Sequence, residues 1–173
     1  IDSWAVDYAL MNGQLMRGAP YHYRDDRTAD GVAAVHSVVD HRTLYRRNGL
    51  QFLPFNTLYQ LAADQLSGAL DDADRVLLIP DLLTFWLTGH EQAERTNAST
   101  TGLLDVRTRM WDDDLIEQLG FSASLLPALV DPGVTVGPLL PSVRMGLGAP
   151  TALRVVTVGS HDTASAVVAV PMT

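Results

Sequence analysis

One short stretch near the end of the sequence constrains the fold more than any other. Residues 154–158 are rich in β-branched side chains and predict a strand, and Gly159 and Ser160 follow as a turn. Residues 161–170 then have the alanine- and valine-rich composition of a buried helix. Because a strand that turns directly into a helix is typical of mixed domains, the sequence predicts an α/β or α+β fold.

The same stretch contains the strongest candidate for a catalytic group. Open α/β sheets bind ligands beyond the carboxyl ends of their strands, which places His161, Asp162 and Thr163 in a cleft. A carboxylate in the first turn of a helix is held ionised by unpaired N–H groups, so Asp162 could accept a proton from a substrate hydroxyl. Asp162 could instead only cap the helix, and His161 could be structural. The His-Asp pair lacks the further ligands that a metal site needs.

The remaining chain alternates between patterns of strands, helices and turns. Strands are expected at 1–10, 14–17 and 76–79, with Asn12 and Gly13 forming a hairpin turn between the first two. Helices are expected at 29–40, 43–47, 57–65, 81–89, 112–120 and 121–130. Residues 96–101 predict a hydroxyl-rich loop, and 131–150 predict an irregular linker. The apolar face of residues 82–87 is expected to pack in the core.

Composition excludes several classes of function. The chain has 173 residues, about one domain, and 47% of them are apolar, which is enough for a sizeable core. The net charge is −8 and no basic cluster is present, which argues against nucleic acid and against an anionic membrane surface. No apolar run reaches the ~18 residues that a membrane span needs. The chain has no cysteine, which excludes disulfides and is consistent with the cytoplasm.

Several stretches together resemble one enzyme family. The segment 159–166, Gly-Ser-His-Asp-Thr-Ala-Ser-Ala, resembles the signature of rhamnulokinases, a branch of the carbohydrate kinase family that also contains glycerol kinase and xylulokinase. Five further stretches agree, namely 1–7, 23–28, 49–61, 80–82 and 96–101. Residues 49–61 are close to specific for the rhamnulokinase branch, and the resemblance covers nearly the whole chain.

The resemblance implies a fold and a domain. It implies an incomplete actin-like, ribonuclease-H-like α/β domain with helical insertions. Residues 1–173 would form the sugar-binding N-terminal domain of a carbohydrate kinase, without its first strands, its phosphate loop and its nucleotide domain. The start at Ile1 and the end soon after an apolar run also lead us to expect a fragment. An exposed sheet edge would favour self-association of such a fragment.

The resemblance also implies a reaction. Such kinases transfer the γ-phosphoryl group of ATP, with Mg²⁺, to a hydroxyl of a ketose. In the rhamnulokinase branch the substrate is L-rhamnulose, the product is its 1-phosphate, and the pathway is rhamnose catabolism. The sequence has no phosphate-loop motif of the type Gly-x-x-x-x-Gly-Lys-Ser/Thr. ATP and Mg²⁺ are therefore expected to bind mostly to segments absent here, and the fragment alone is expected to be inactive.

Six residues receive site roles from the resemblance. Asp162 matches the general base, and His161 and Thr163 match substrate contacts beside it. Ala5 stands where the family usually has a substrate-contacting glycine, so its methyl group could crowd the pocket and alter the sugar preference. Trp4 could stack on the sugar or lie in the core. Asp25 could accept a hydrogen bond from a sugar hydroxyl or take part in a surface ion pair.

Three alternatives stay open at this point. The first is a sibling kinase that acts on L-fuculose or xylulose. The second is a non-catalytic sugar-binding module, which would not need an ionised base at the start of a helix. The third is an interaction domain that uses its apolar surface and has no dependence on sugar.

Overall fold

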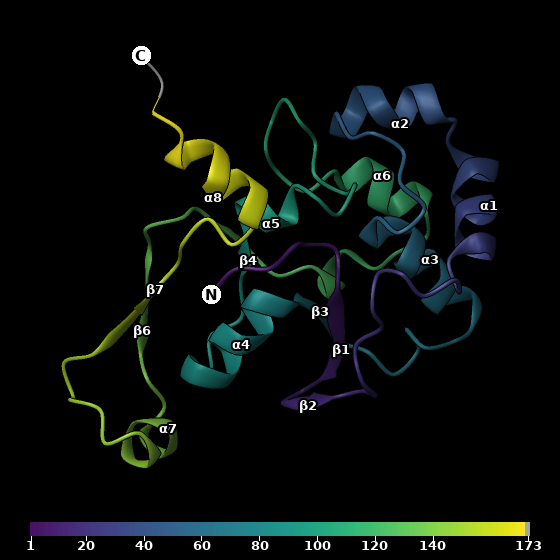
Figure 1. The fold of residues 1–173 in the computed structure, drawn as a ribbon. Helices are drawn as coiled ribbons and strands as arrows, with labels where there is room; N and C mark the ends of the chain where they lie inside the picture. Colours follow the sequence, from purple (N-terminus) through teal and green to yellow (C-terminus); the bar gives the residue numbers. More distant parts are fainter. Residues whose placement is uncertain (172–173) are drawn as a thin grey trace.

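A three-stranded antiparallel sheet forms the centre of the computed structural model, which describes residues 1–171 (Figure 1). Its strand order is β2-β1-β3, with β1 at Tyr8–Asn12, β2 at Leu15–Met16 and β3 at Arg75–Leu78. The β1–β2 hairpin confirms the predicted turn, because Asn12 pairs with Leu15 and Gly13 adopts the positive φ of 56° that such a turn requires.

Of the three hydrophobic clusters in the described residues, the alternation of side chains along β1 and β3 separates the two that pack against this sheet. Tyr8 and Leu78 point to one face of the sheet, while Met11 and Leu77 point to the other. This follows from the two-residue period of a strand. The larger cluster lies under helices α1, α2, α3 and α6, and the smaller one lies under α4 (Figure 1).

The helices over the larger cluster follow the predicted pattern. They are α1 at Ala29–Val38, α2 at His41–Asn48, α3 at Thr57–Leu66 and α6 at Asp113–Gln118. Asp40 accepts a hydrogen bond from the backbone N–H of Thr43 and so caps α2, which ends at Gly49 with a φ of 72°. Helices α1 and α3 pack closely at Gly31, where an added Cβ would lie 2.1 Å from the carbonyl oxygen of Tyr59.

Helix α4 covers the opposite face and begins earlier than expected. It spans Ile79–Thr88 rather than starting at Asp81, because proline is well suited to the first turn of a helix and Pro80 lies there. Its end at Gly89, with a φ of 76°, confirms the predicted stop. Leu82 and Phe85 are buried, but Trp86 is 44% exposed, so the prediction of a uniformly buried apolar face was wrong.

Two segments that were expected to be a loop and a helix form other structures. Residues 96–101 were predicted as a loop, but α5 occupies Arg95–Ala98 after the short strand β4 at Ala93–Glu94. The Glu94 side chain accepts hydrogen bonds from Thr96 N–H and Asn97 N–H and thereby starts this helix. The helix predicted at 121–130 is only a 3₁₀ turn, η1 at Ala123–Leu125, followed by β5 at Leu129–Val130, which pairs in parallel with β4.

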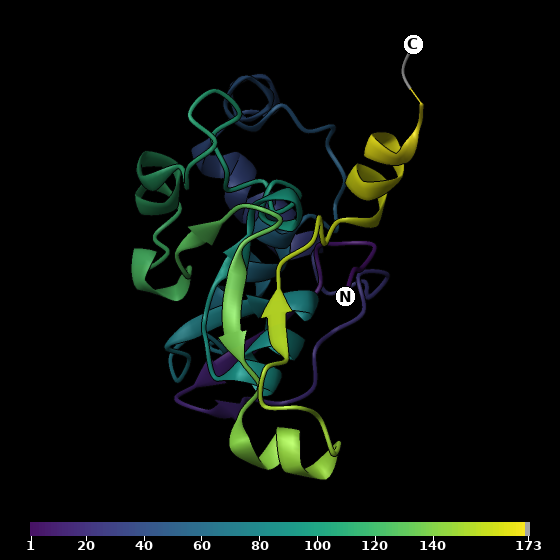
Figure 2. The same ribbon diagram turned by 90° about the vertical axis from the view of Figure 1, so that its left-hand side faces the viewer.

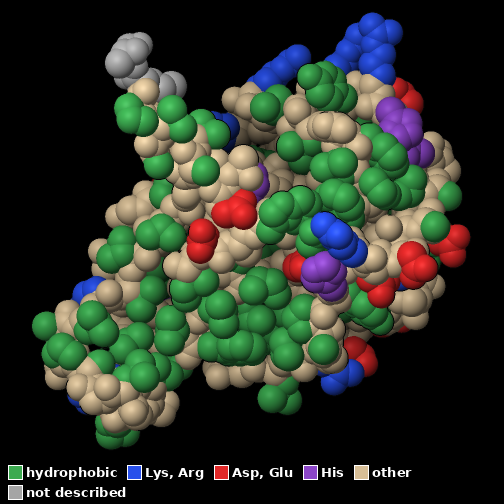
Figure 3. Space-filling model, viewed as in Figure 1, with side chains coloured by type: hydrophobic (Ala, Val, Ile, Leu, Met, Phe, Trp, Pro, Cys, Tyr) green, Lys and Arg blue, Asp and Glu red, His purple; other side chains and the backbone are tan. Residues whose placement is uncertain are grey.

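The predicted linker at 131–150 is instead part of an ordered arm. Strand β6 at Thr135–Pro138 pairs antiparallel with β7 at Arg154–Val156, and α7 at Pro141–Gly146 closes the connection between them (Figure 2). The segment contains four prolines and four glycines, and these residues are typical of loops, so the sequence predicted no regular structure there. Hydrophobic side chains cover much of the arm in the space-filling view (Figure 3), and Met145 and Leu147 are among the exposed ones.

Helix α8, at Asp162–Ala169, contradicts the prediction of a buried helix. None of its residues is buried, and Val168 is 82% exposed. The helix projects away from the rest of the domain in both ribbon views (Figures 1 and 2). Its composition shows that it is apolar, but composition alone does not show which surface covers it. Within residues 1–171, no helix has both the length and the apolar character needed to cross a membrane.

The close approach at Gly31 generates a prediction about stability. The substitution Gly31→Ala should lower the free energy of unfolding by about 1–3 kcal/mol, because the methyl group would push α1 away from the backbone of α3. Gly146→Ala is the matched control, since nothing lies within 4 Å of a Cβ at that helical position. It should be neutral or stabilising by up to about 1 kcal/mol. Urea unfolding measures both, and equal effects would contradict the packing argument.

Candidate functional site

The candidate site forms where the beginning of the chain meets the turn before α8. Ser3 and His161 form an isolated parallel β-bridge. The Ser3 N–H donates to the Ser160 carbonyl at 2.8 Å, and the Asp162 N–H donates to the Ser3 carbonyl at 3.0 Å. Two parallel segments therefore end side by side, and the region beyond their carboxyl ends is where α/β proteins bind ligands.

A cavity of about 230 Å³ opens at this junction. Its walls come from residues 4–6, which follow Ser3, from residues 50–56 and from the start of α8. The lining residues are Trp4, Ala5, Val6, Leu50, Gln51, Leu53, Phe55, Asn56, Thr100, His161 and Thr163. Four of the six predicted site residues, Trp4, Ala5, His161 and Thr163, therefore lie together although they come from opposite ends of the chain.

Asp162 lies between two residues that line the cavity but does not line it itself. Its side chain is 42% exposed and accepts a hydrogen bond from Thr163 Oγ1 at 3.1 Å, while His161 Nε2 lies 4.0 Å from its Oδ1. The N-cap of α8 is His161, so Asp162 occupies the first helical position and its side chain does not cap the helix in the way we had considered. A carboxylate in the first turn of a helix is stabilised in its ionised form by the helix dipole.

Trp4 belongs to the rim of the cavity rather than to the core. Its side chain is 46% exposed and stacks on Tyr23, with ring centroids 4.3 Å apart, while Phe55 lies 5.4 Å from it. Of the two positions considered for Trp4, the structure therefore contradicts the one in the core. Aromatic faces at a cavity rim provide an apolar surface on which the C–H face of a sugar ring can pack.

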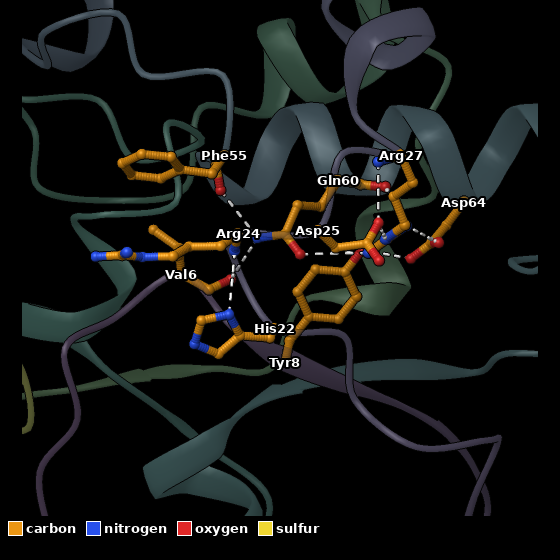
Figure 4. A network of polar contacts seen from close by, with 9 residues as sticks. All are labelled: Val6, Tyr8, His22, Arg24, Asp25, Arg27, Phe55, Gln60 and Asp64. Carbon is orange, nitrogen blue, oxygen red and sulfur yellow. Dashed lines mark hydrogen bonds and ion pairs between the residues drawn. The ribbon is translucent and has the colours of Figure 1, made fainter.

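The wall formed by Ala5 and Val6 has an unusual backbone. Ala5 has a φ of 112° and Val6 a φ of 61°, both in the region that favours glycine. Such a conformation persists only where its surroundings fix it. Here the Val6 carbonyl accepts a hydrogen bond from Thr57 Oγ1 at 2.8 Å. It also accepts one from Gln60 Nε2 at 3.4 Å (Figure 4). The backbone conformation itself would therefore favour a glycine at position 5.

Gln60 connects this wall to a buried ionic network (Figure 4). Arg27 donates to Gln60 Oε1 and to Asp64, and Asp64 also accepts from the hydroxyl of Tyr8. Burial raises the pKa of Asp64, and the hydrogen bond from Tyr8 and the charge of Arg27 partly offset this rise. Its side chains come from β1, from the loop before α1 and from α3, and the hydrogen bond from Arg27 to Gln60 Oε1 leaves Gln60 Nε2 directed at the Val6 carbonyl.

Asp25 lies in this network and not at the cavity. Its Oδ1 accepts a hydrogen bond from the backbone N–H of Arg27 at 2.9 Å and lies 4.0 Å from Arg27 Nε (Figure 4). It is absent from the residues that line the cavity. Of the two roles considered for Asp25, the structure therefore shows the ion-pair arrangement.

Two buried carboxyl groups beneath the site were not identified from the sequence. Glu94 and Asp81 are both 2% exposed. The Asp81 Oδ1 accepts from the Glu94 N–H at 3.1 Å, while its Oδ2 has no hydrogen-bond partner among the described residues. Burial raises the pKa of Asp81 to about 7, and the neighbouring charge of Glu94 adds to the rise, whereas the hydrogen bond from Glu94 N–H opposes it. The Glu94 side chain contacts the turn at Ser160.

The described part of the chain does not supply a metal site. Residues 1–171 contain no group of three or more histidine, aspartate or glutamate side chains arranged to hold a metal ion. This finding concerns only a site formed by such side chains of residues 1–171 alone, because Mg²⁺ in kinases usually binds through one or two carboxylates together with waters and substrate phosphates.

Comparison with known proteins identifies the family. Residues 17–169 match the N-terminal domain of the FGGY family of carbohydrate kinases, so the chain belongs to this family. It is similar to a rhamnulokinase from Pectobacterium atrosepticum, with 45% identity over 177 residues, and to one from Yersinia pestis, with 45% identity over 175 residues. These matches cover 99% of the chain, and they confirm the resemblance to rhamnulokinases. The chain spans about a third of the length of these relatives, 34% and 35% respectively.

Solved structures confirm the fold. A gluconate kinase and a xylulose kinase, both from Lactobacillus acidophilus, superpose with a TM-score of 0.86 at 20% identity. The superpositions cover 95% and 96% of this chain and 34% of each of those chains. The predicted actin-like, ribonuclease-H-like α/β class is therefore confirmed.

The strained wall leads to a prediction about residue 5. The substitution Ala5→Gly should raise the free energy of unfolding by about 1 kcal/mol, because relief of a positive-φ conformation exceeds the entropic cost of a glycine. Ala9→Gly is the control, since Ala9 is also a buried alanine but lies in the regular strand β1, where glycine should destabilise. Chemical denaturation compares the two, and a loss of stability in both would contradict the assignment of strain.

The buried position of Asp81 leads to a prediction about pH. Because the folded-state pKa is raised to about 7, the folded state retains the proton that the unfolded state releases near pH 4. The stabilising contribution of Asp81 is thus complete below about pH 4 and is lost as the pH rises to about 7. Asp81→Asn removes this dependence. As the pH rises from about 4 to about 7, the free energy of unfolding of the variant should therefore rise on the order of 4 kcal/mol relative to that of the wild type.

Urea unfolding at a series of pH values measures the Asp81 effect. Asp40→Asn provides a control of opposite sign, because hydrogen bonds from Thr43 lower the pKa of Asp40. Its contribution to stability is present at neutral pH and is lost on acidification. Wild-type and Asp81→Asn curves that stay parallel from pH 4 to pH 7 would refute the raised pKa.

Proposed function

We propose that the protein containing this chain is an ATP-dependent kinase that converts L-rhamnulose to L-rhamnulose 1-phosphate in rhamnose catabolism. In this proposal the chain supplies the sugar site and the catalytic base. The observation that carries it is the cavity at the Ser3–His161 bridge, which brings Trp4, Ala5, His161 and Thr163 together beside Asp162. The 45% identity to proteins named rhamnulokinase supports the choice of sugar.

The proposed step is a direct phosphoryl transfer. The ketose hydroxyl attacks the γ-phosphorus of ATP, the new O–P bond forms as the bond to ADP breaks, and Asp162 takes the hydroxyl proton. His161 and Thr163 line the cavity on both sides of Asp162 in the sequence and would orient the sugar. The aromatic pair of Trp4 and Tyr23 would bound the sugar on its apolar side. ATP and Mg²⁺ would bind mostly to parts of the protein other than residues 1–173.

Two alternative functions make different predictions. A sibling kinase would use L-fuculose or xylulose, and the methyl group of Ala5 in the cavity wall is the feature that favours such a change. A non-catalytic sugar-binding module would keep the cavity but would not depend on Asp162. An exposed carboxylate that does not cap its own helix favours the catalytic role.

Partners and location follow from the same proposal. The partner is a small-molecule sugar, and neither the acidic composition nor the described helices indicate nucleic acid or a membrane. We propose a cytoplasmic location, as for an enzyme of sugar catabolism. Self-association of the isolated chain stays a prediction, for which the apolar arm of β6, β7 and α7 provides a candidate surface.

The test is an assay of the whole protein against L-rhamnulose, L-fuculose, D-xylulose and glycerol. L-Rhamnulose should give the highest kcat/KM, and Asp162→Asn should lower kcat by about 10²–10⁴-fold because it removes the general base. Asp113→Asn is the matched control, since Asp113 is also an exposed carboxylate at the first position of a helix. It should leave the rate unchanged. The isolated 173-residue chain should show no turnover, because base catalysis cannot replace a phosphate-binding site.

The outcomes separate the alternatives. Turnover of another sugar with the same loss in Asp162→Asn would support the sibling kinase and would refute the choice of L-rhamnulose. Turnover that survives Asp162→Asn would refute the assignment of the base. Sugar binding without turnover by the whole protein would support the non-catalytic module.

A further inference from the structure

We propose that the buried Glu94 is a positioning residue that fixes the orientation of Asp162. This inference rests on the proposed function, because it concerns the group that would act as the base. Glu94 does not line the cavity, so it would act through the turn at 159–161 and not on the sugar itself. No sequence motif indicated this role.

Glu94 is the centre of a cluster of hydrogen bonds. Its Oε2 accepts from the Ser160 N–H at 2.9 Å, from Ser160 Oγ at 2.7 Å, from Thr96 Oγ1 at 2.5 Å and from the Asn97 N–H at 3.3 Å. Its Oε1 accepts from the Thr96 N–H at 2.9 Å. Every partner is a donor, which suits a carboxylate that only accepts. Ser160 is 3% exposed, so these bonds are shielded from water.

The cluster extends to the next two residues of the turn. Thr96 Oγ1, which Glu94 orients, accepts the His161 N–H at 3.2 Å. The Asp162 N–H in turn donates to the Ser3 carbonyl at 3.0 Å. The N–H groups of three consecutive residues, Ser160, His161 and Asp162, are thus each held by a different acceptor.

This arrangement explains how an exposed carboxylate can be held in place. The Asp162 side chain itself has one hydrogen bond among the described residues, from the adjacent Thr163. Its direction therefore depends on the backbone at 160–162, and two of the three acceptors there depend on Glu94 directly or through Thr96. Since misplacement of a catalytic group by about 1 Å can cost 10²-fold in rate, the Glu94 cluster should matter for turnover.

The test compares Glu94→Gln with Asp112→Asn in the whole protein. The amide that Glu94→Gln introduces would direct a donor at groups that are themselves donors, so the turn should loosen. Asp112 is the matched control because it is also a buried carboxylate that caps a helix, α6, away from the cavity. We expect Glu94→Gln to lower kcat with L-rhamnulose by about 10²-fold with a smaller change in KM. Asp112→Asn should reduce stability without this loss of kcat.

A double variant distinguishes positioning from a general structural effect. If Glu94 acts through Asp162, the variant Glu94→Gln/Asp162→Asn should be no slower than Asp162→Asn alone. Additive losses would overturn the proposal, and so would a Glu94→Gln enzyme with unchanged kcat. If Glu94→Gln fails to fold, Ser160→Ala replaces it, because this change removes only the hydrogen bond from the Ser160 hydroxyl to Glu94. A kcat equal to that of the wild type in Ser160→Ala, together with unchanged amide exchange, would then count against the proposal.

Amide hydrogen exchange gives a readout that is independent of turnover. Glu94→Gln should speed exchange of the amides at 160–162, whereas Asp112→Asn should leave them unchanged. If the wild-type protein turns over none of the four sugars, the proposed function fails and the catalytic part of this inference fails with it. The exchange data would still show whether Glu94 holds the turn, so the two failures are distinguishable.

Discussion

The pairing of Ser3 with His161 is the contact on which the site depends. It joins the first residues of the chain to the turn before α8, and each partner alone would be an irregular segment. Parallel pairing requires a long connection between the paired segments. Here that connection contains the three-stranded sheet, the two core clusters that pack against it and the β6–β7 arm. The intervening domain thus brings residues 4–6 together with His161 and Thr163, and these residues line the same cavity.

The two walls of the cavity are fixed by different interactions. The Ala5–Val6 wall is held by neutral hydrogen bonds from Thr57 and Gln60, which outweigh an unfavourable backbone conformation. The opposite wall at 159–161 is held by the buried carboxylate of Glu94. Neither wall is part of a long helix or strand. Rigid placement of such segments requires supporting contacts from regular elements, and α3 and the β4–α5 junction provide them.

Local features of the fold were predictable from the sequence, whereas long-range ones were not. The Asn12–Gly13 hairpin and the helix end at Gly89 depend on conformations that few residues adopt, so short motifs identified them. The bonds between Glu94 and Ser160 join residues 66 positions apart, and no periodicity marks them. The exposure of Trp4, for which a core position had been one alternative, and the exposure of α8, which was expected to be buried, have a related reason. Apolar composition shows that a side chain favours burial, but it does not show which surface is available to bury it.

Within the site, residues 159–166 were predictable because their residue types are unusual together, a polar His-Asp-Thr run at a strand-to-helix turn. The role of residue 5 was only half predictable. The sequence indicated crowding by the methyl group of Ala5, but the structure adds a second effect, a φ of 112° that favours glycine for reasons independent of any ligand. The two effects act on different quantities, since the first changes which sugar fits and the second changes the stability of the folded chain. The backbone conformation would therefore favour a glycine at this position whether or not that glycine contacted a substrate.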